Sequence, residues 1–244
     1  MTKHPSSHEI TDRDGLAETL DSISGTLKYM ADAGCRGFEC SPEQLQAVKL
    51  LGSLPGVQPQ GLEELQSEVN TCVRCNLSKT RNHTVFGEGD PGTRLVFVGE
   101  GPGHDEDRQG KPFVGAAGKL LTKIIQAMGL AREEVYICNI IKCRPPGNRN
   151  PAPEEVAACM PFLEQQLRLI QPDYICALGA VAAHTLLKTE MPISRLRGRF
   201  HNFGNISLMP TYHPAYLLRN PEKKREVWED VQVLMREMEL PRTI

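Results

Sequence analysis

The 244-residue sequence has no long apolar run, no excess of positive charge and no repeated segment. Its apolar stretches fall short of the roughly 20 residues that cross a bilayer, and residues 1–14 lack the apolar core of a secretory signal. A net charge of -2 argues against a protein coated in positive charge, so any contact with nucleic acid must be a local patch. We therefore expect a cytoplasmic protein without a membrane segment.

Eight cysteines are present, and a reducing compartment leaves their thiols free for metal binding or catalysis. Cys72 and Cys75 form a close pair, Cys143 follows far downstream, and Cys159 comes a helix length later. Four thiolates in this arrangement can hold one metal centre only if the fold brings them together. By spacing alone they suit tetrahedral zinc as well as an iron-sulfur cluster.

The N-terminal quarter differs in composition from the rest of the chain. Apolar residues at helical spacing predict an amphipathic helix within residues 16–30, and a good N-cap followed by proline predicts a second helix over residues 41–52. Residues 53–61 have the proline and glycine content of a linker. We expect residues 1–60 to be a partly disordered helical extension and residues 61–244 to form one globular domain.

Beyond residue 60, short apolar runs alternate with helical patterns. The strand-like runs are residues 95–98, 135–138, 174–178 and 206–209, and the helical patterns are residues 118–128, 153–170, 180–187 and 221–238. This alternation predicts an α/β fold of three layers, α/β/α, around a central, mostly parallel four-stranded sheet. Cys138 and Cys176 fall inside strand patterns, so we expect them to be buried core thiols.

Ligands of such folds bind at the carboxyl ends of the strands, which makes the segments after the strands the places to look for chemistry. The first strand is followed by a glycine-rich loop with several carboxylates (residues 99–107), the second by Asn139, and the fourth by a segment containing His213. These side chains are expected to converge at one edge of the sheet. A Rossmann fingerprint is disfavoured because Pro102 interrupts it and we expect no helix before Gly115.

Five segments in the second part of the chain form a distinctive series. They are Gly99-Glu100-Gly101-Pro102-Gly103, Gly110-Lys111-Pro112-Phe113-Val114-Gly115, Asn139-Ile140-Ile141-Lys142-Cys143-Arg144-Pro145-Pro146, Leu178-Gly179-Ala180-Val181-Ala182-Ala183 and His213-Pro214-Ala215-Tyr216-Leu217-Leu218-Arg219. In this order they resemble the family 4 uracil-DNA glycosylases, the iron-sulfur branch of the uracil-DNA glycosylase superfamily. The resemblance covers residues 61–244. It implies a [4Fe-4S] cluster on Cys72, Cys75, Cys143 and Cys159.

The resemblance also implies the substrate, which is a uracil flipped out of DNA, because an enzyme cannot reach the N-glycosidic bond inside a stacked duplex. Asn139 would read the base by donating to O4 and accepting from N3–H, demands that cytosine reverses. Phe113 would stack on the base, with Gly101 beside it. Glu106 would form the wall that excludes the methyl group of thymine.

The catalytic residues are assigned in the same way. Gly101 stands where other branches carry a catalytic aspartate, so Glu100 is the candidate for positioning water or stabilising an oxocarbenium-like sugar, and Glu106 is the competing candidate. His213 would donate to uracil O2 as negative charge develops on the leaving base. Ala215 stands where covalently trapping relatives carry serine, and their long insertion is missing, which argues against covalent capture of DNA.

Basic residues near these motifs predict a local DNA-binding surface. They are Lys142, Arg144, Arg149, Arg195, Arg197, Arg199 and Arg219. Tyr216, Leu217 and Leu218 are candidates for a wedge that fills the gap left by the flipped base, beside Arg219; the alternative is a helix packed on the core.

Together these expectations describe a monofunctional uracil-DNA glycosylase that releases uracil, leaves an abasic site and starts base-excision repair without cutting the backbone. Because hydrolysis needs no redox step, the cluster is expected to be structural. The alternative is a catalytically silent iron-sulfur DNA-binding module, such as a polymerase-associated relative, although the retained Glu100, Asn139 and His213 favour the enzyme. We expect a monomer that binds uracil-containing DNA, with residues 1–60 as a candidate docking segment for a protein partner.

Overall fold

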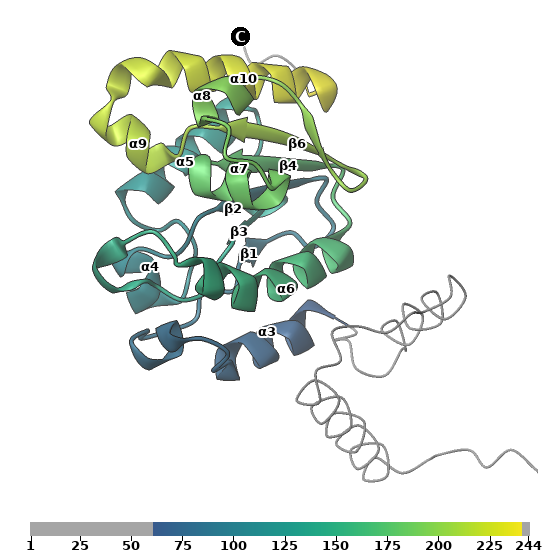
Figure 1. Ribbon diagram of the computed structural model, residues 1–244. Coiled ribbons are helices and arrows are strands. Elements are labelled where there is room, and N and C mark those ends of the chain that lie inside the picture. The colour runs from purple at the N-terminus through teal and green to yellow at the C-terminus, as the bar shows by residue number, and fades with distance from the viewer. Residues whose placement is uncertain (1–60, 241–244) are drawn as a thin grey trace, which may run out of the picture. The chain divides into compact units, whose positions relative to one another are not determined.

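The structure, a computed structural model, describes residues 61–240, so the helices and the linker predicted within residues 1–60 lie outside it. Six strands form one sheet in the order β1-β3-β2-β4-β6-β5 (Figure 1). The strands are β1 (Glu88–Gly89), β2 (Leu95–Gly99), β3 (Tyr136–Asn139), β4 (Tyr174–Leu178), β5 (His201–Phe203) and β6 (Ile206–Thr211). The described helices are α3 (Leu62–Thr71), α4 (His104–Gln109), α5 (Ala116–Ala127), α6 (Pro153–Ile170), α7 (Ala180–Leu187), α8 (Ile193–Leu196), α9 (Pro214–Arg219) and α10 (Lys224–Glu237).

The four strands predicted from apolar runs form the parallel centre of the sheet, in the order β3, β2, β4 and β6. They are nearly continuous apolar runs because helices cover both of their faces. Strands β1 and β5 add antiparallel edges, so the predicted number of four strands was wrong. Each edge strand has only two or three residues, with Phe203 as the one large apolar side chain, and therefore carries little apolar signal.

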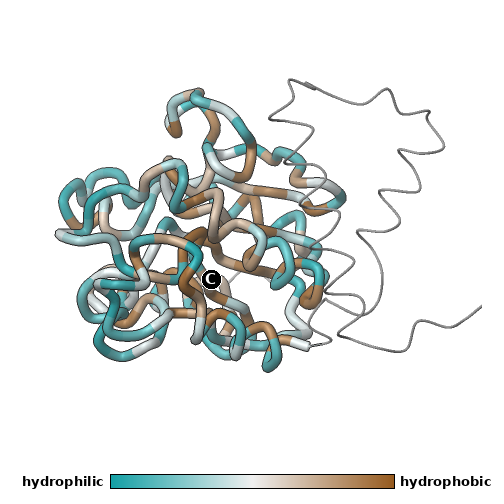
Figure 2. Tube along the Cα trace, turned by 60° about the horizontal axis from the view of Figure 1, so that its bottom comes forward, coloured by the Kyte–Doolittle hydropathy of each residue, from teal (hydrophilic) through white to brown (hydrophobic). Residues whose placement is uncertain are grey.

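Alternate residues of the central strands face two different layers of helices. Val96 and Val98 of β2 pack in the core beneath α6 and α7, whereas Leu95 and Phe97 pack in the core beneath α5 and α10. Figure 1 shows α6 and α10 on opposite sides of the sheet, and Figure 2 shows apolar segments concentrated in the interior of the trace. The described residues therefore form the three-layer α/β/α arrangement that the sequence predicts.

The sequence patterns miss two short helices, α4 and α8. Helix α4 begins at His104, directly after Gly103, so the expectation of no helix before Gly115 was wrong. Its six residues are all polar, with no apolar periodicity, and its acidic first turn suits a helix N-terminus. None of the helices within residues 61–240 is long and apolar enough to cross a membrane.

The strand register decides which segments meet at the carboxyl edge of the sheet. Gly99 at the end of β2 pairs with Asn139 at the end of β3, and Leu178 at the end of β4 pairs with Thr211 at the end of β6. All four strands therefore end level with one another. The chain segments that follow β2, β3 and β6 start from one line, which is the geometry needed for a shared site.

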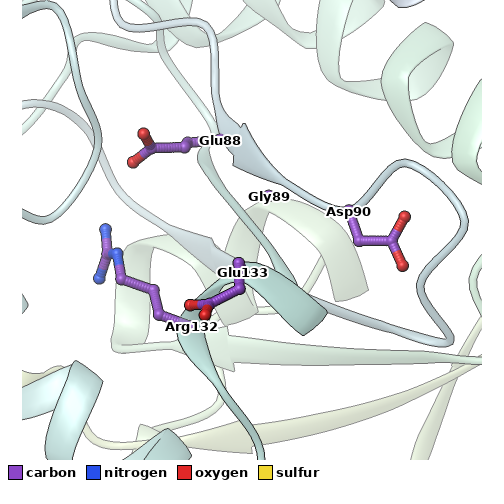
Figure 3. Close-up of a pocket in the computed structure, with 5 residues that line it drawn as sticks. All are labelled: Glu88, Gly89, Asp90, Arg132 and Glu133. Carbon is purple, nitrogen blue, oxygen red and sulfur yellow. The ribbon is translucent and has the colours of Figure 1, made fainter.

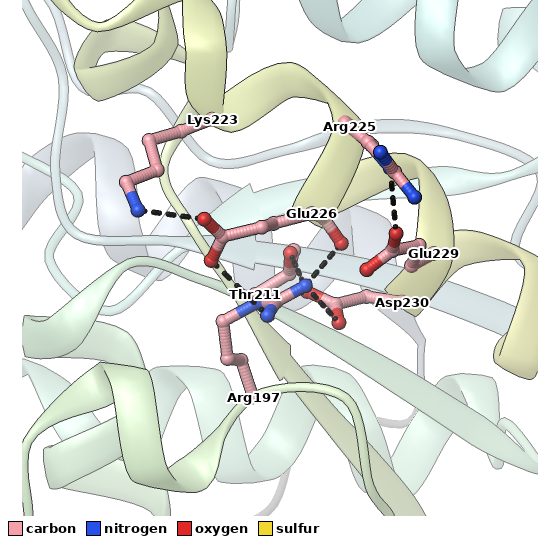
Figure 4. A network of polar contacts seen from close by, with 7 residues as sticks. All are labelled: Arg197, Thr211, Lys223, Arg225, Glu226, Glu229 and Asp230. Atoms are coloured by element: carbon pink, nitrogen blue, oxygen red, sulfur yellow. Dashed lines mark hydrogen bonds and ion pairs between the residues drawn. The ribbon is translucent and has the colours of Figure 1, made fainter.

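A buried ion pair ties α10 to the end of β6 (Figure 4). The Asp230 carboxylate is 1% exposed and accepts hydrogen bonds from Arg197 Nε at 2.9 Å, Arg197 Nη2 at 2.7 Å and Thr211 Oγ1 at 2.5 Å. Arg197 also pairs with Glu226 at 3.2 Å. The guanidinium is thus committed to internal partners, and the expectation that Arg197 belongs to the DNA-binding surface was wrong.

This ion pair predicts a large difference between two neighbouring acidic residues of α10. Asp230→Ala should lower the free energy of unfolding by about 3 kcal/mol, because it leaves the Arg197 charge without its buried partner. Glu229 pairs with Arg225 at the surface, so Glu229→Ala should change stability by less than about 0.5 kcal/mol. Denaturant unfolding of both variants measures the difference, and equal losses would contradict the assignment.

Candidate active site

One cavity of about 380 Å³ lies at the carboxyl edge of the sheet. Its walls come from the segments after β2, β3 and β6, together with α4 and the loop before α5. All six predicted catalytic and base-binding residues line this cavity: Glu100, Gly101, Glu106, Phe113, Asn139 and His213. Residues from three separate parts of the sequence therefore share one pocket.

Asn139 places an unpaired acceptor at the base of this pocket. The residue ends β3 and is 1% exposed, and its side-chain Oδ1 has no hydrogen-bond partner among residues 61–240. A buried polar atom left unpaired costs about 1–3 kcal/mol, which a ligand with a matching donor would recover. Gly99 beside it leaves the necessary room, because a Cβ at Gly99 would lie 2.5 Å from Oδ1 and 2.6 Å from Phe113 Cζ.

Phe113 is buried in the pocket wall with its backbone in the left-handed region, at φ 51°. Such a conformation is rare for a bulky residue and costs about 1–3 kcal/mol, so its surroundings must hold it there. Helix α5 approaches closely at Gly118, where a Cβ would lie 1.8 Å from the Phe113 carbonyl oxygen. On the other side, Arg132 Nη2 donates to the carbonyl of Pro112 at 2.6 Å. The Phe113 ring lies 5.6 Å from the His213 ring.

Glu106 of α4 holds the same loop from its other end. Its Oε1 accepts hydrogen bonds from the backbone N–H groups of Val114 and Gly115, both at 2.9 Å. Its Oε2 faces Gly103, where a Cβ would lie only 2.7 Å away. The sequence did not reveal this anchoring contact, because nothing in the spacing of Glu106 and Val114 indicates that α4 and the loop meet.

Glu100 is the pocket carboxylate without an internal partner. It follows β2, and within the described chain no hydrogen bond holds its side chain, although burial raises its pKa above the ordinary glutamate value. Its carboxylate is therefore available to a ligand or a water molecule. The next residue, Gly101, has no room for a side chain, because a Cβ there would lie 2.7 Å from Ile141 Cγ1. A carboxylate cannot stand at Gly101 without moving its neighbour.

His213 is held as a neutral ring. It caps the N-terminus of α9, where its Nδ1 accepts a hydrogen bond from the backbone N–H of Ala215 at 3.1 Å. Burial lowers the pKa of His213 to about 4, with a smaller contribution from the nearby Arg219 charge. Since Nδ1 accepts, the single ring proton sits on Nε2. Gly179 has a positive φ of 93°, which suits glycine, and it lies so close to His213 that a Cβ at Gly179 would lie 2.9 Å from the His213 Cβ.

The candidate wedge residues divide between core and surface. Leu217 is 1% exposed and packs with α5 and α10, so it is not free to enter DNA and its predicted place in a wedge was wrong. Leu218 is 46% exposed. Tyr216 lines the pocket and stacks on Tyr212 at 5.1 Å, and Arg219 also lines the pocket.

The loop between Cys143 and α6 reaches the pocket through residues 145–150, which the sequence did not assign to it. Arg144 Nε donates to Asn148 Oδ1 at 2.7 Å. Arg149 forms two hydrogen bonds to the buried Glu155 carboxylate, at 2.7 and 2.8 Å. Arg149 therefore anchors this loop to α6, and its guanidinium is not a free phosphate contact.

The four predicted cysteine ligands line a second, small cavity between α3 and α6: Cys72, Cys75, Cys143 and Cys159. Three donors point at their sulfur atoms. Arg81 Nη1 lies 3.3 Å from Cys143 Sγ, the Lys142 backbone N–H lies 3.3 Å from Cys159 Sγ, and that of Arg74 lies 3.5 Å from Cys72 Sγ. Donors of this kind suit thiolate ligands.

The spacing of these sulfurs bears on which metal group they fit. Tetrahedral zinc, at about 2.3 Å from each sulfur, would bring the sulfurs to about 3.8 Å from one another. Within residues 61–240 no three His, Cys, Asp or Glu side chains are spaced as ligands of one metal ion. The four thiols that share this cavity are the described residues that could hold a metal centre. Cys138 and Cys176 are each 1% exposed in the strands, as predicted.

Another depression, about 490 Å³, lies at the β1 edge of the sheet and is lined by different residues (Figure 3). Three carboxylates, Glu88, Asp90 and Glu133, line it with one cation, Arg132, so negative groups outnumber positive ones in its lining. It lies beside the start of β3, away from the carboxyl ends of the strands, and contains none of the predicted site residues. Its charge does not suit a phosphate-bearing ligand.

A mostly parallel sheet with an unpaired amide, an aromatic ring and a neutral imidazole around one pocket defines an α/β protein whose pocket suits a small, planar, polar ligand. The model of the uracil DNA glycosylase superfamily matches residues 86–232. The chain belongs to the uracil-DNA glycosylase superfamily.

Comparison with individual proteins shows which branch of the superfamily this chain resembles. A type-4 uracil-DNA glycosylase of Thermotoga maritima is 48% identical over 175 residues, covering 70% of this chain and 91% of that protein. A type-4 enzyme of Archaeoglobus fulgidus is 43% identical over 179 residues, covering 70% and 90%. A DNA polymerase of Bacillus phage SP01 is 30% identical over 149 residues, but these cover only 16% of that protein. The resemblance to the family 4 branch is confirmed.

The Glu106 contacts predict different effects on the free energy of unfolding for two substitutions. Glu106→Gln keeps an oxygen that can accept from Val114 and Gly115, so its stability should stay within about 0.5 kcal/mol of the parent protein. Glu106→Ala leaves two backbone N–H groups without their acceptor and should cost about 1–3 kcal/mol. Denaturant unfolding measures both, and an equally large loss in Glu106→Gln would show that the charge, and not the anchoring oxygen, is what matters.

Proposed function

We propose that this chain is a monofunctional uracil-DNA glycosylase that hydrolyses the N-glycosidic bond of a uracil flipped out of DNA. The observation that supports the proposal is that one pocket contains both a hydrogen-bond acceptor and a hydrogen-bond donor that are fixed before a ligand binds. Asn139 offers an unpaired buried acceptor, and His213 offers a neutral ring with its proton on Nε2. Uracil supplies a donor at N3 and an acceptor at O2, on the same side of the base.

Base recognition follows from hydrogen-bond matching. Asn139 Oδ1 accepts from uracil N3–H and its amide N–H donates to O4, whereas cytosine presents an acceptor at N3 and a donor at C4. Binding cytosine would therefore leave buried polar groups unpaired. Such a mismatch discriminates more strongly than a difference in size within a hydrophobic pocket. Phe113 gives the base a stacking face worth about 1–3 kcal/mol.

Discrimination against thymine requires a filled space next to C5 of the base. Glu106 is suited to this wall because two backbone hydrogen bonds immobilise its carboxylate at the pocket surface. A rigid wall can exclude one methyl group, although a hydrophobic pocket alone rejects such a difference only about 10- to 200-fold. The same anchoring makes Glu106 less suited than Glu100 to directing water.

Cleavage of the N-glycosidic bond develops negative charge on the base and positive charge on the sugar. Pocket residues stabilise both charges. The bond from C1′ to N1 breaks with its electron pair going to the base, and His213 Nε2–H donates to O2 as that negative charge develops. Glu100 stabilises the positive sugar and orients a water molecule whose oxygen bonds to C1′. The water proton passes to Glu100 and on to solvent, and the released base takes a proton at N1. The products are uracil and an abasic site with an intact backbone.

Four cysteines would hold the [4Fe-4S] cluster: Cys72, Cys75, Cys143 and Cys159. Its contribution is structural, since the reaction transfers no electrons. The cluster would join the segment after α3 to both ends of the loop between Cys143 and Cys159. Because that loop lines the pocket at residues 145–150, the cluster braces one wall of the active site.

Contact with DNA is assigned to the rim of the pocket. Arg219 and Arg144 would contact phosphates, and Leu218, exposed at the end of α9, would fill the gap left by the flipped base, next to Tyr216. A catalytically silent DNA-binding module is the second candidate, since a phage DNA polymerase contains a similar segment. The intact set of Glu100, Asn139 and His213 favours the enzyme.

The function is tested with an oligonucleotide that contains one uracil. After incubation and hot alkali the strand should break at the uracil, whereas without alkali it should stay whole. His213→Ala should slow excision by about 100- to 1,000-fold, because it removes the donor to O2, with little change in DNA binding. Excision that is unchanged in this variant would remove His213 from the mechanism.

The protein used in this assay must be folded and must contain its metal centre. A brown protein with iron bound supports the cluster, and a colourless protein with zinc would contradict it. If folded, iron-loaded protein leaves the uracil strand intact after alkali, the enzymatic proposal is wrong and the silent binding module takes its place.

A further inference from the structure

Lys142 is a fully buried lysine that contacts the residue assigned to read the base. It is 1% exposed, and its Nζ donates to the backbone carbonyl of Asn139 at 2.8 Å and to Gln166 Oε1 at 2.5 Å. The sequence placed this lysine on the DNA-binding surface, and that expectation was wrong because no part of the ammonium reaches solvent. Its position calls for an internal role.

The contacts beyond Lys142 form a closed internal network. Gln166 is 0% exposed, and its Nε2 donates to the Phe86 carbonyl at 2.9 Å and to the Tyr136 hydroxyl at 3.1 Å. The acceptors of Lys142 are therefore both neutral, and in the described part of the chain no carboxylate forms an ion pair with it. A buried charge is costly unless an opposite charge lies nearby.

The candidates for an opposite charge are the cysteine thiolates that lie next to Lys142 in the chain and in the fold. The backbone N–H of Lys142 points at Cys159 Sγ at 3.3 Å, and the next residue is Cys143. Both cysteines line the cavity assigned to the cluster, and Lys142 lines it as well. Five consecutive residues, 139–143, thus run from the uracil pocket to the cysteine cavity, with Lys142 in contact with both.

We propose that Lys142 is a positioning residue that couples the cluster to base recognition: its buried ammonium fixes the Asn139 carbonyl, and the thiolate-ligated cluster is its counter-charge. This inference rests on the proposed function, and it gives a hydrolase a reason to hold a cluster that does no redox chemistry. Asn139 must keep an unpaired amide at a fixed depth, and a hydrogen bond to a charged donor holds its backbone more strongly than a neutral one.

The test compares holoprotein variants with two independent readouts. Lys142→Met removes the charge at similar volume and leaves the backbone N–H to Cys159 in place. Tyr136→Phe is the matched control, because it alters the same buried network without touching Asn139 or the cysteines. The first readout is the affinity for an oligonucleotide carrying 2′-fluoro-2′-deoxyuridine, which resists cleavage, relative to the matched cytosine oligonucleotide. The second is the midpoint potential of the bound cluster.

Lys142→Met should lose about tenfold or more of its preference for the uracil oligonucleotide, in line with loss of one charge-assisted hydrogen bond. Its cluster should become harder to reduce, with a more negative potential, because a nearby positive charge is gone. Affinity for the cytosine oligonucleotide should stay the same. Tyr136→Phe should match the parent protein in both readouts.

Two results would overturn the proposal. One is a folded, iron-loaded Lys142→Met with the parent preference for uracil, and the other is a lost preference with an unchanged potential. If Lys142→Met does not fold, Lys142→Gln supplies the same comparison, being polar, uncharged and one bond shorter. A parent protein that shows no preference for uracil at all would instead refute the proposed function, so the two failures are distinguishable.

Discussion

The pairing of Gly99 with Asn139 at the ends of β2 and β3 is the constraint on which the pocket depends. It sets the buried amide level with the loop that carries Glu100, and the missing side chain of Gly99 makes room for both the amide and the Phe113 ring. The parallel register of β4 and β6 then brings His213 to the same edge. A slip of one residue would turn every side chain to the other face of the sheet.

Rigidity around the pocket comes from contacts that do not face the ligand. Glu106 and Arg132 hold the two ends of the loop that carries the strained Phe113, and the Asp230 ion pair fixes the approach to His213. Catalysis by preset dipoles needs such support, because groups that must reorganise during the reaction lose most of their effect. The strained backbone of Phe113 therefore lies at a position where the fixed aromatic ring can stack on a bound base.

The sequence predicted the elements whose signal is local and apolar. The four central strands and α6 and α7 were found from runs and periodicity, and the residues after the strands met at one edge because parallel strands require it. The edge strands and α4 were missed, since elements of two to six residues with almost no apolar side chains carry no periodicity. Which charges are buried could not be predicted either: Lys142 and Arg197 look like surface residues until tertiary partners are known.

The proposed reaction depends on a neutral hydrogen-bond donor, His213, that is fixed in the pocket before uracil binds. Its most direct test is nitrogen NMR of the histidine rings in the folded protein at pH 6. We expect His213 to be neutral there, with its proton on Nε2, because burial lowers its pKa to about 4 and Nδ1 accepts from the backbone N–H of Ala215. A doubly protonated ring at pH 6, or a proton on Nδ1, would contradict it.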